Sequence, residues 1–129
     1  MGKSRWTRVG GGCIALLCLT VPAGCRGRAH YEGKSAAALE AMLRSDNPAV
    51  QAQGAHGLSR LGPEARAAVP ALIDALRSKE APVRESAALA LGQIGPDART
   101  AVPALTRLTQ DPDHLVRKAA QEALQQLRK

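Results

Sequence analysis

Histidine and cysteine are the residue types in this chain that most often bind metals or act in catalysis, and the sequence holds three of each. His30, His56 and His114 lie far apart, without cysteine or carboxylate partners at metal-ligand spacing. His56 also aligns with Leu89 and Glu122 in the repeat described below, which indicates a surface position. We therefore expect no metal site and no cofactor.

All three cysteines lie within the first 25 residues, in a segment that is typical of an export signal. A basic stretch precedes an apolar run at 13–21, which is shorter than the roughly 20 residues of a membrane span. Small residues, Ala23 and Gly24, stand immediately before Cys25, as a signal peptidase requires. We expect residues 1–24 to be a signal peptide.

The ending Ala23-Gly24-Cys25 resembles the lipobox of bacterial lipoproteins, in which the cysteine thiol is joined to diacylglycerol and the cysteine becomes the new N-terminus. The resemblance implies a lipidated Cys25 with fatty acyl groups such as palmitate, a polar tether over 25–34, and a place in the cell envelope at the inner or outer membrane. Pro22 stands where that family usually has leucine. The alternatives are an ordinary secretory signal cut near Ala23, a short uncleaved anchor, or a cytoplasmic chain.

Charge and aromatic content argue against a nucleic-acid partner. The 129 residues carry a formal charge of +7, but residues 35–129 hold 12 basic and 10 acidic side chains. Most of the basic excess therefore lies in the leader and the tether. The two aromatic residues are Trp6 and Tyr31, so no base-stacking platform can form beyond residue 34.

Beyond the tether, the chain repeats with a period of 33 residues. Gly62-Pro63 returns as Gly95-Pro96, and the segment AVPAL at 68–72 returns at 101–105. We expect one repeat domain over 35–129. It divides into a half-unit at 35–47, full units at 48–80 and 81–112, and a closing half-unit at 113–129.

Each full unit has the pattern of two helices. In the first helix, apolar residues follow helical spacing, as at Val83, Ala87, Leu91 and Ile94. The glycine that follows, Gly95 in this unit, suits a left-handed C-terminal residue, and the next proline prevents the helix from continuing.

The second helix of each unit carries a proline near its start, Pro70 or Pro103, which we place in the first turn. The joins between units, at 46–48, 80–82 and 111–113, each contain an acidic or Asx residue that can cap the following helix. The frequent alanines let facing helices approach closely, so that successive pairs can stack.

The string VRESAALALGQIG at 83–95, followed by PDARTAVPAL at 96–105, resembles a HEAT repeat of the short form found in phycobilisome-lyase-type HEAT-like proteins. The resemblance covers roughly residues 35–129. It implies an all-α, armadillo-like superhelix of about five helices, which presents a ridge of second helices to a protein partner.

Two HEAT-like families have enzymatic or enzyme-like roles, and the sequence lacks the residues of both. Deoxyhypusine hydroxylases hold di-iron with His-Glu pairs, whereas the histidines here precede Tyr31, Gly57 and Leu115. Bilin lyases grip a tetrapyrrole, usually with aromatic residues, which the repeats lack. We expect a non-catalytic protein without a small-molecule substrate.

The exposed side of the second helices is the remaining candidate site. The register places Ala41, Asp74 and Arg107 in one row, and Arg44, Arg77 and Gln110 in the next. Three arginines with a single aspartate could accept an acidic peptide or partner helix. The alternative is an ordinary solvated helix surface.

Together these observations predict a protein-binding scaffold or adaptor, tethered by lipid to a bacterial membrane surface, whose protein partner the sequence does not name. One alternative is an accessory, lyase-like factor that binds a cofactor-bearing protein. A second alternative is a weak nucleic-acid binder, which the nearly balanced repeat charge disfavours.

Overall fold

The computed structural model describes residues 32–129, and the expected signal peptide (1–24) and Cys25 lie outside this range. The described residues form six α-helices and two 3₁₀ helices, against about five helices expected. Their bounds are α2 Ala36–Leu43, α3 Pro48–Leu61, η2 Gly62–Ala68, α4 Val69–Ala75, α5 Ala81–Ile94, η3 Gly95–Ala101, α6 Val102–Leu108 and α7 His114–Leu127.

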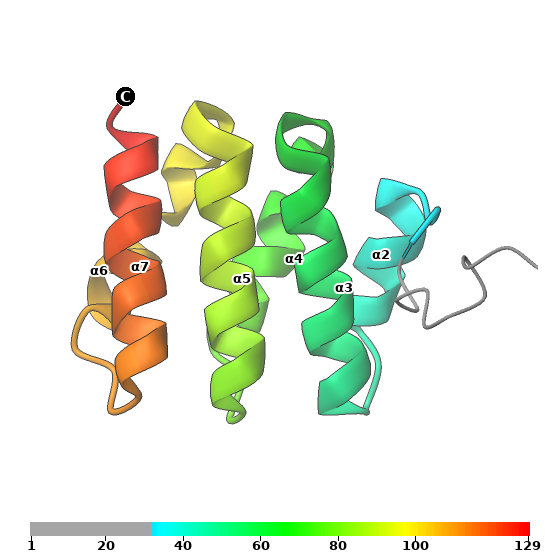
Figure 1. Ribbon diagram of the computed structural model, residues 1–129, viewed down its shortest axis with the longest axis horizontal. Coiled ribbons are helices and arrows are strands. Elements are labelled where there is room, and N and C mark those ends of the chain that lie inside the picture. Colours follow the sequence, from blue (N-terminus) through cyan, green and yellow to red (C-terminus); the bar gives the residue numbers. More distant parts are fainter. Residues whose placement is uncertain (1–31) are drawn as a thin grey trace, which may run out of the picture.

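The helices form two layers (Figure 1). The longer helices α3, α5 and α7 stand side by side in one layer, and the shorter helices α2, α4 and α6 lie behind them in the other. Each full unit contributes one helix to each layer. This arrangement confirms the expected all-α solenoid of HEAT-like units.

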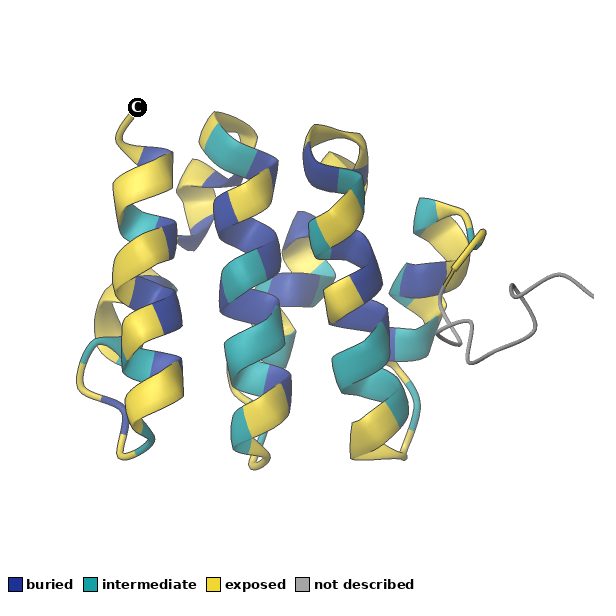
Figure 2. Ribbon diagram, in the orientation of Figure 1, coloured by how far each residue is buried: buried dark blue, intermediate teal, exposed yellow. Residues whose placement is uncertain are grey.

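The core lies between the two layers and repeats with the sequence. Leu39, Leu72 and Leu105, spaced by 33 residues, are buried in α2, α4 and α6, and Leu58 and Leu91 are buried in α3 and α5. Buried positions therefore recur along each helix (Figure 2). Apolar side chains that a single helix pair would leave in water are covered by the neighbouring unit.

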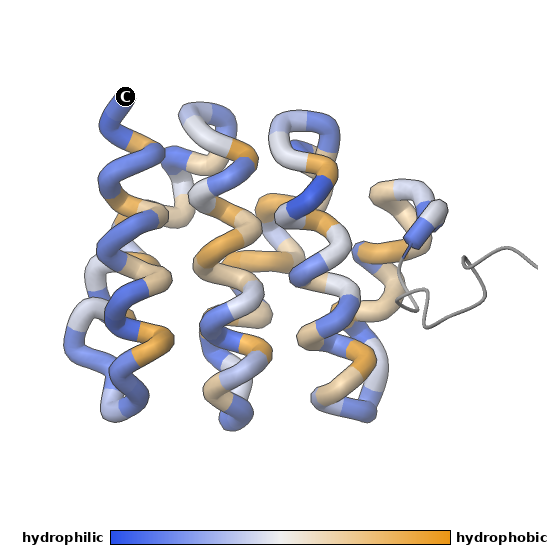
Figure 3. Tube along the Cα trace, in the orientation of Figure 1, coloured by the Kyte–Doolittle hydropathy of each residue, from blue (hydrophilic) through white to orange (hydrophobic). Residues whose placement is uncertain are grey.

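Helix α7 is more hydrophilic along its length than α5. In Figure 3, α7 is coloured mainly as hydrophilic, whereas α5 carries more hydrophobic residues. The reason is position: α5 packs between α3 and α7, so both of its sides are covered.

Within the described residues, no helix is long and apolar enough to span a bilayer.

Close approach between neighbouring helices depends on glycine and alanine. A Cβ atom added at Gly92 of α5 would lie 2.9 Å from the Cα atom of Ala123 in α7. One added at Gly54 of α3 would lie 2.8 Å from the carbonyl oxygen of Leu39 in α2. The prediction that small side chains permit tight stacking is confirmed.

The first helix of each unit ends at a glycine, as expected. Gly62 has φ 56° and ψ −130°, and Gly95 has φ 79° and ψ −145°, a backbone region that is accessible mainly to glycine. The prolines that follow end the α-helix, but the chain then continues as the 3₁₀ helices η2 and η3. The connection between the two helices of a unit is thus itself helical.

Two of the three expected helix caps are present. Asn47 accepts a hydrogen bond from the Ala49 N–H at 2.9 Å, and Asp113 accepts one from the Leu115 N–H at 2.8 Å. The expectation that the 80–82 join also supplies a side-chain cap was wrong. Glu80 occupies the N-cap of α5 without a side-chain hydrogen bond to the helix, because its carboxylate stands one methylene farther from the backbone than that of aspartate.

Candidate protein-binding surface

The second-helix layer, which comprises α2, α4, α6 and the turns that follow them, exposes all five residues expected to bind a partner: Arg44, Asp74, Arg77, Arg107 and Gln110. Helix α4 begins at Val69 with Pro70 in its first turn, as predicted, because proline lacks the N–H that would be unpaired there. Leu72 and Leu76 of the same helix are buried. This inward anchoring fixes the helix rotation that leaves Asp74 and Arg77 exposed.

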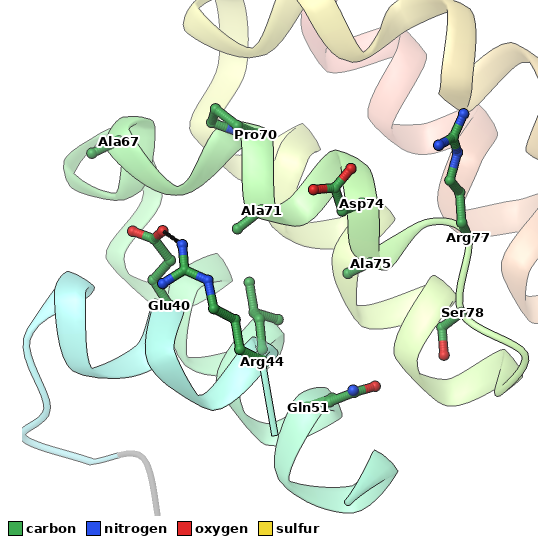
Figure 4. A pocket seen from close by; sticks show the side chains of 11 residues that line it. Glu40, Arg44, Gln51, Ala67, Pro70, Ala71, Asp74, Ala75, Arg77 and Ser78 are labelled. Carbon is green, nitrogen blue, oxygen red and sulfur yellow. Dashed lines mark hydrogen bonds and ion pairs between the residues drawn. The ribbon is translucent and has the colours of Figure 1, made fainter. Parts of the chain in front are cut away.

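The structure brings three of the five residues together around one open pocket of about 390 Å³ between α2 and α4. Figure 4 shows Arg44 entering from the C-terminal end of α2, Asp74 from α4, and Arg77 from the turn that follows α4. Arg107 and Gln110 do not line this pocket. The complete lining consists of Glu40, Leu43, Arg44, Gln51, Ala67, Pro70, Ala71, Asp74, Ala75, Arg77 and Ser78.

The charge at the pocket is mixed, which differs from the expected arginine row with one aspartate. Glu40 lines the pocket as well, and its Oε1 atom accepts a hydrogen bond from Arg44 Nη2 at 2.7 Å. The side chain of Arg44 is nevertheless 71% exposed, and that of Glu40 is 25% exposed. One of the three arginines expected to bind a partner is thus already paired with a residue four positions earlier.

Glu40 was missed because the repeat register does not mark it. The equivalent residues in the next two units are Ile73 and Thr106, so a comparison of repeats favours no charge at this position. The available signal was local, since Glu40 and Arg44 have the i, i+4 spacing of a helical ion pair.

The other two charged residues at the pocket are unpaired within residues 32–129. Neither the carboxylate of Asp74 nor the guanidinium of Arg77 has a hydrogen bond or ion pair to another described residue. In Figure 4, the carboxylate of Asp74 lies on the side of α4 nearer the Glu40–Arg44 pair, whereas the guanidinium of Arg77 extends away from that pair. Asp74 is therefore the unpaired charge at the pocket that lies nearer to the Glu40–Arg44 pair.

A second cluster of charges joins α5 to the segment before α7. Arg84 Nε and Nη2 donate to the two carboxylate oxygens of Asp111, each at 2.9 Å. These side chains are only 13% and 5% exposed. The hydrogen bonds from Arg84 lower the pKa of Asp111 against the opposing effect of burial, and the same bonds raise the pKa of Arg84. This pair is a buried structural link between α5 and the loop that precedes α7.

The position of Arg84 in the repeat also has a local role. Gln51 Nε2 donates to the Ser45 carbonyl at 2.6 Å, Arg84 Nη1 to the Ser78 carbonyl at 2.8 Å, and Arg117 Nη1 to the Asp111 carbonyl at 2.7 Å. Each of these side chains thus holds the loop that precedes its own helix.

None of these clusters provides a metal site. No group of three or more histidine, cysteine, aspartate or glutamate residues is placed to hold a metal ion in the part of the chain that the structure describes. His56 and His114 are exposed, as expected for His56 from its position in the repeat.

The stacked helix pairs and the exposed second-helix layer define an α-solenoid of the repeat-protein class. The family model that describes HEAT repeats matches residues 35–127, which is more than half of the chain. The chain belongs to the HEAT-repeat family. A search of curated proteins gave no match to it.

Proposed function

We propose that this protein is a non-catalytic scaffold or adaptor that binds another protein on its second-helix layer. HEAT repeats commonly mediate protein–protein interaction. The observation that carries the proposal is the open pocket between α2 and α4, where Asp74 and Arg77 are exposed without partners in residues 32–129. Charged groups that make no contribution within the fold remain available to orient a partner.

We also propose that the scaffold acts at a membrane surface, as a lipoprotein of the cell envelope. The support is the basic and apolar leader at 1–24 and the lipobox-like ending at Cys25. A single acyl chain binds membranes weakly, but the several chains of a mature bacterial lipoprotein would hold the protein firmly. The tether over 25–34 would then separate the repeat domain from the lipid.

A narrower candidate follows from the likeness to phycobilisome-lyase-type repeats, namely an accessory factor whose partner protein bears a cofactor. An open pocket in the second-helix layer is compatible with this role. Its lining contains no aromatic side chain, so the protein part of such a partner would have to supply most of the contact. Co-expression with a chromophore-bearing protein would test it through a change in absorbance.

Site-specific photo-crosslinking in the native cell tests the scaffold proposal. A benzoylphenylalanine residue at Ala67, an exposed residue at the pocket, should give a discrete protein adduct. The same group at Gln125, on the exposed surface of α7, is the matched control and should give none. Adducts of the same size from both positions, or none from Ala67, would contradict binding on the second-helix layer.

The intact mass of the protein recovered from native membranes tests the proposed lipidation and membrane location separately. We expect a mass that corresponds to residues 25–129 plus diacylglyceryl and acyl groups. An unmodified full-length mass in the soluble fraction would refute the lipoprotein proposal and leave the scaffold proposal standing.

A further inference from the structure

We propose that the pocket between α2 and α4 binds a lysine or arginine side chain of the partner protein, with Asp74 as its counter-ion. This inference rests on the proposed scaffold function and specifies its partner chemistry. It differs from the acidic partner that the arginine rows alone would favour.

The internal repeat supplies a comparison between two equivalent junctions. The pocket lies at the junction of the first two second-layer helices, α2 and α4, and the equivalent residues of the next junction are displaced by 33 positions. Three apolar lining residues are kept, since Leu43, Pro70 and Ala71 correspond to Leu76, Pro103 and Ala104, whereas Ala67 and Ala75 are replaced by Thr100 and the larger Leu108. Of the polar lining, Arg44 alone keeps its type, as Arg77. The others change: Glu40, Gln51, Asp74, Arg77 and Ser78 correspond to Ile73, Arg84, Arg107, Gln110 and Asp111.

These changes leave the first junction open. At the second junction, Arg84 and Asp111 are joined by two hydrogen bonds of 2.9 Å. At the first, no hydrogen bond joins Gln51 to Ser78: Gln51 donates instead to the Ser45 carbonyl, and the Ser78 hydroxyl accepts from the Glu80 N–H. The two side chains therefore line the pocket without closing it.

The acidic residues at the first junction are not needed to hold the repeat together. The second junction packs with Ile73 and Arg107 at the positions that Glu40 and Asp74 occupy in the first. Asp74 forms no ion pair within residues 32–129. Its carboxylate is consequently available to pair with a group from outside the described residues.

The distribution of charge around the pocket selects a cation over an anion. Asp74 from α4 and Glu40 from α2 line the pocket from its two sides, and Arg44 is held by Glu40 at 2.7 Å. Arg77 extends away from that pair (Figure 4). An incoming carboxylate would meet Asp74 directly, whereas an incoming ammonium or guanidinium group would gain a charge-assisted hydrogen bond from it.

The shape and the apolar lining suit the rest of a basic side chain. Leu43, Ala71 and Ala75 provide small apolar surfaces beside Asp74. The methylene stems of lysine and arginine pack on such surfaces while their charged heads reach a polar partner. A volume of about 390 Å³ admits side chains of a partner segment rather than a whole helix.

The test is selection of random 12-residue peptides, displayed on phage, against the full-length protein. We expect binders to share a lysine or arginine at one fixed position. The variant Asp74→Arg, which introduces the residue type of the second junction, should lose this preference and select acidic residues there instead. Asp97→Arg makes the same charge change at an exposed residue outside the pocket and should keep the wild-type preference.

A binding measurement on one selected peptide makes the test quantitative. Asp74→Asn should weaken its affinity roughly tenfold, as expected for loss of one charge-assisted hydrogen bond, and Asp97→Asn should not. Thermal unfolding by circular dichroism confirms that the variants fold, which we expect because both aspartates are exposed.

Each contrary result bears on a definite proposal. Binders without a basic position, a basic preference that survives Asp74→Arg, or the absence of any binder would overturn the cation pocket. Any of these together with an adduct from Ala67 would leave the scaffold proposal intact. Loss of the Ala67 adduct as well would remove both.

Discussion

Arg84 donates two hydrogen bonds of 2.9 Å to the carboxylate of Asp111. Its guanidinium group also donates to the carbonyl oxygens of Ser78 and Lys79. One guanidinium group thus joins the loop before α5 to the loop before α7. The equivalent pair at the preceding junction, Gln51 and Ser78, is uncharged and not bonded. The two junctions of one repeat array are therefore held by different forces.

Removing one partner of this buried ion pair should cost more than removing both. Asp111→Ser leaves the guanidinium of Arg84 largely buried without its counter-ion, and we expect a loss of about 3 kcal/mol in the free energy of unfolding. The double variant Arg84→Gln, Asp111→Ser copies the first junction and should lose less. Urea denaturation of the four proteins measures the coupling, and additive losses would contradict it.

The same pair makes the stability sensitive to acid. The hydrogen bonds from Arg84 hold the pKa of Asp111 below its unfolded value, and Arg117 adds to the effect. Its stabilisation is therefore complete above the unfolded pKa of about 4 and is lost as the pH falls through the lower folded pKa. The free energy of unfolding should fall below about pH 4 more steeply in the wild type than in Asp111→Asn. Parallel curves would show that Asp111 does not carry this dependence.

Gly95 should be needed for its backbone conformation alone. Its φ is 79°, and a Cβ atom added there would meet nothing within 4 Å. Gly95→Ala should therefore destabilise the protein by about 1–2 kcal/mol through backbone strain.

Gly92→Ala should destabilise the protein for a different reason. The new Cβ atom would lie 2.9 Å from the Cα atom of Ala123, and this clash should outweigh the better helix propensity of alanine. Thermal or urea unfolding of each variant checks both expectations.

The uncapped start of α5 offers a stabilising change. Aspartate at position 80 would place a carboxylate where Asp113 already caps α7, so Glu80→Asp should add about 0.5–1 kcal/mol to the free energy of unfolding. Asp113→Ala is the reciprocal variant and should remove about 1 kcal/mol. A neutral or destabilising Glu80→Asp would show that the N-cap geometry at this join does not accept the shorter side chain.

Features that recur in each unit were predictable from the sequence. The 33-residue spacing of Leu39, Leu72 and Leu105 predicted a shared buried position, and the prolines at 70 and 103 predicted the starts of α4 and α6. Each such position is constrained in several copies by the same packing, so the pattern stands out from a single sequence.

Features that occur once were not predictable in the same way. The ion pair between Arg84 and Asp111 joins residues 27 positions apart. The equivalents of Asp111 in the earlier units are Ser45 and Ser78, so the 33-residue repeat does not predict this pair. Glu40 was not predicted to line the site for the same reason, since its equivalents Ile73 and Thr106 are uncharged. The pocket itself arises from such differences between units. It stays open because Gln51 and Ser78 do not bond to each other across the first junction.

The unequal junctions also differ in stiffness, the first being softer than the second. Bending a stack of helices costs least where no directional bond resists the relative movement of two units. No hydrogen bond joins Gln51 to Ser78 at the first junction, whereas Arg84 and Asp111 must part before the second junction can open. A partner that inserts into the first junction would therefore meet less resistance there than it would at the second.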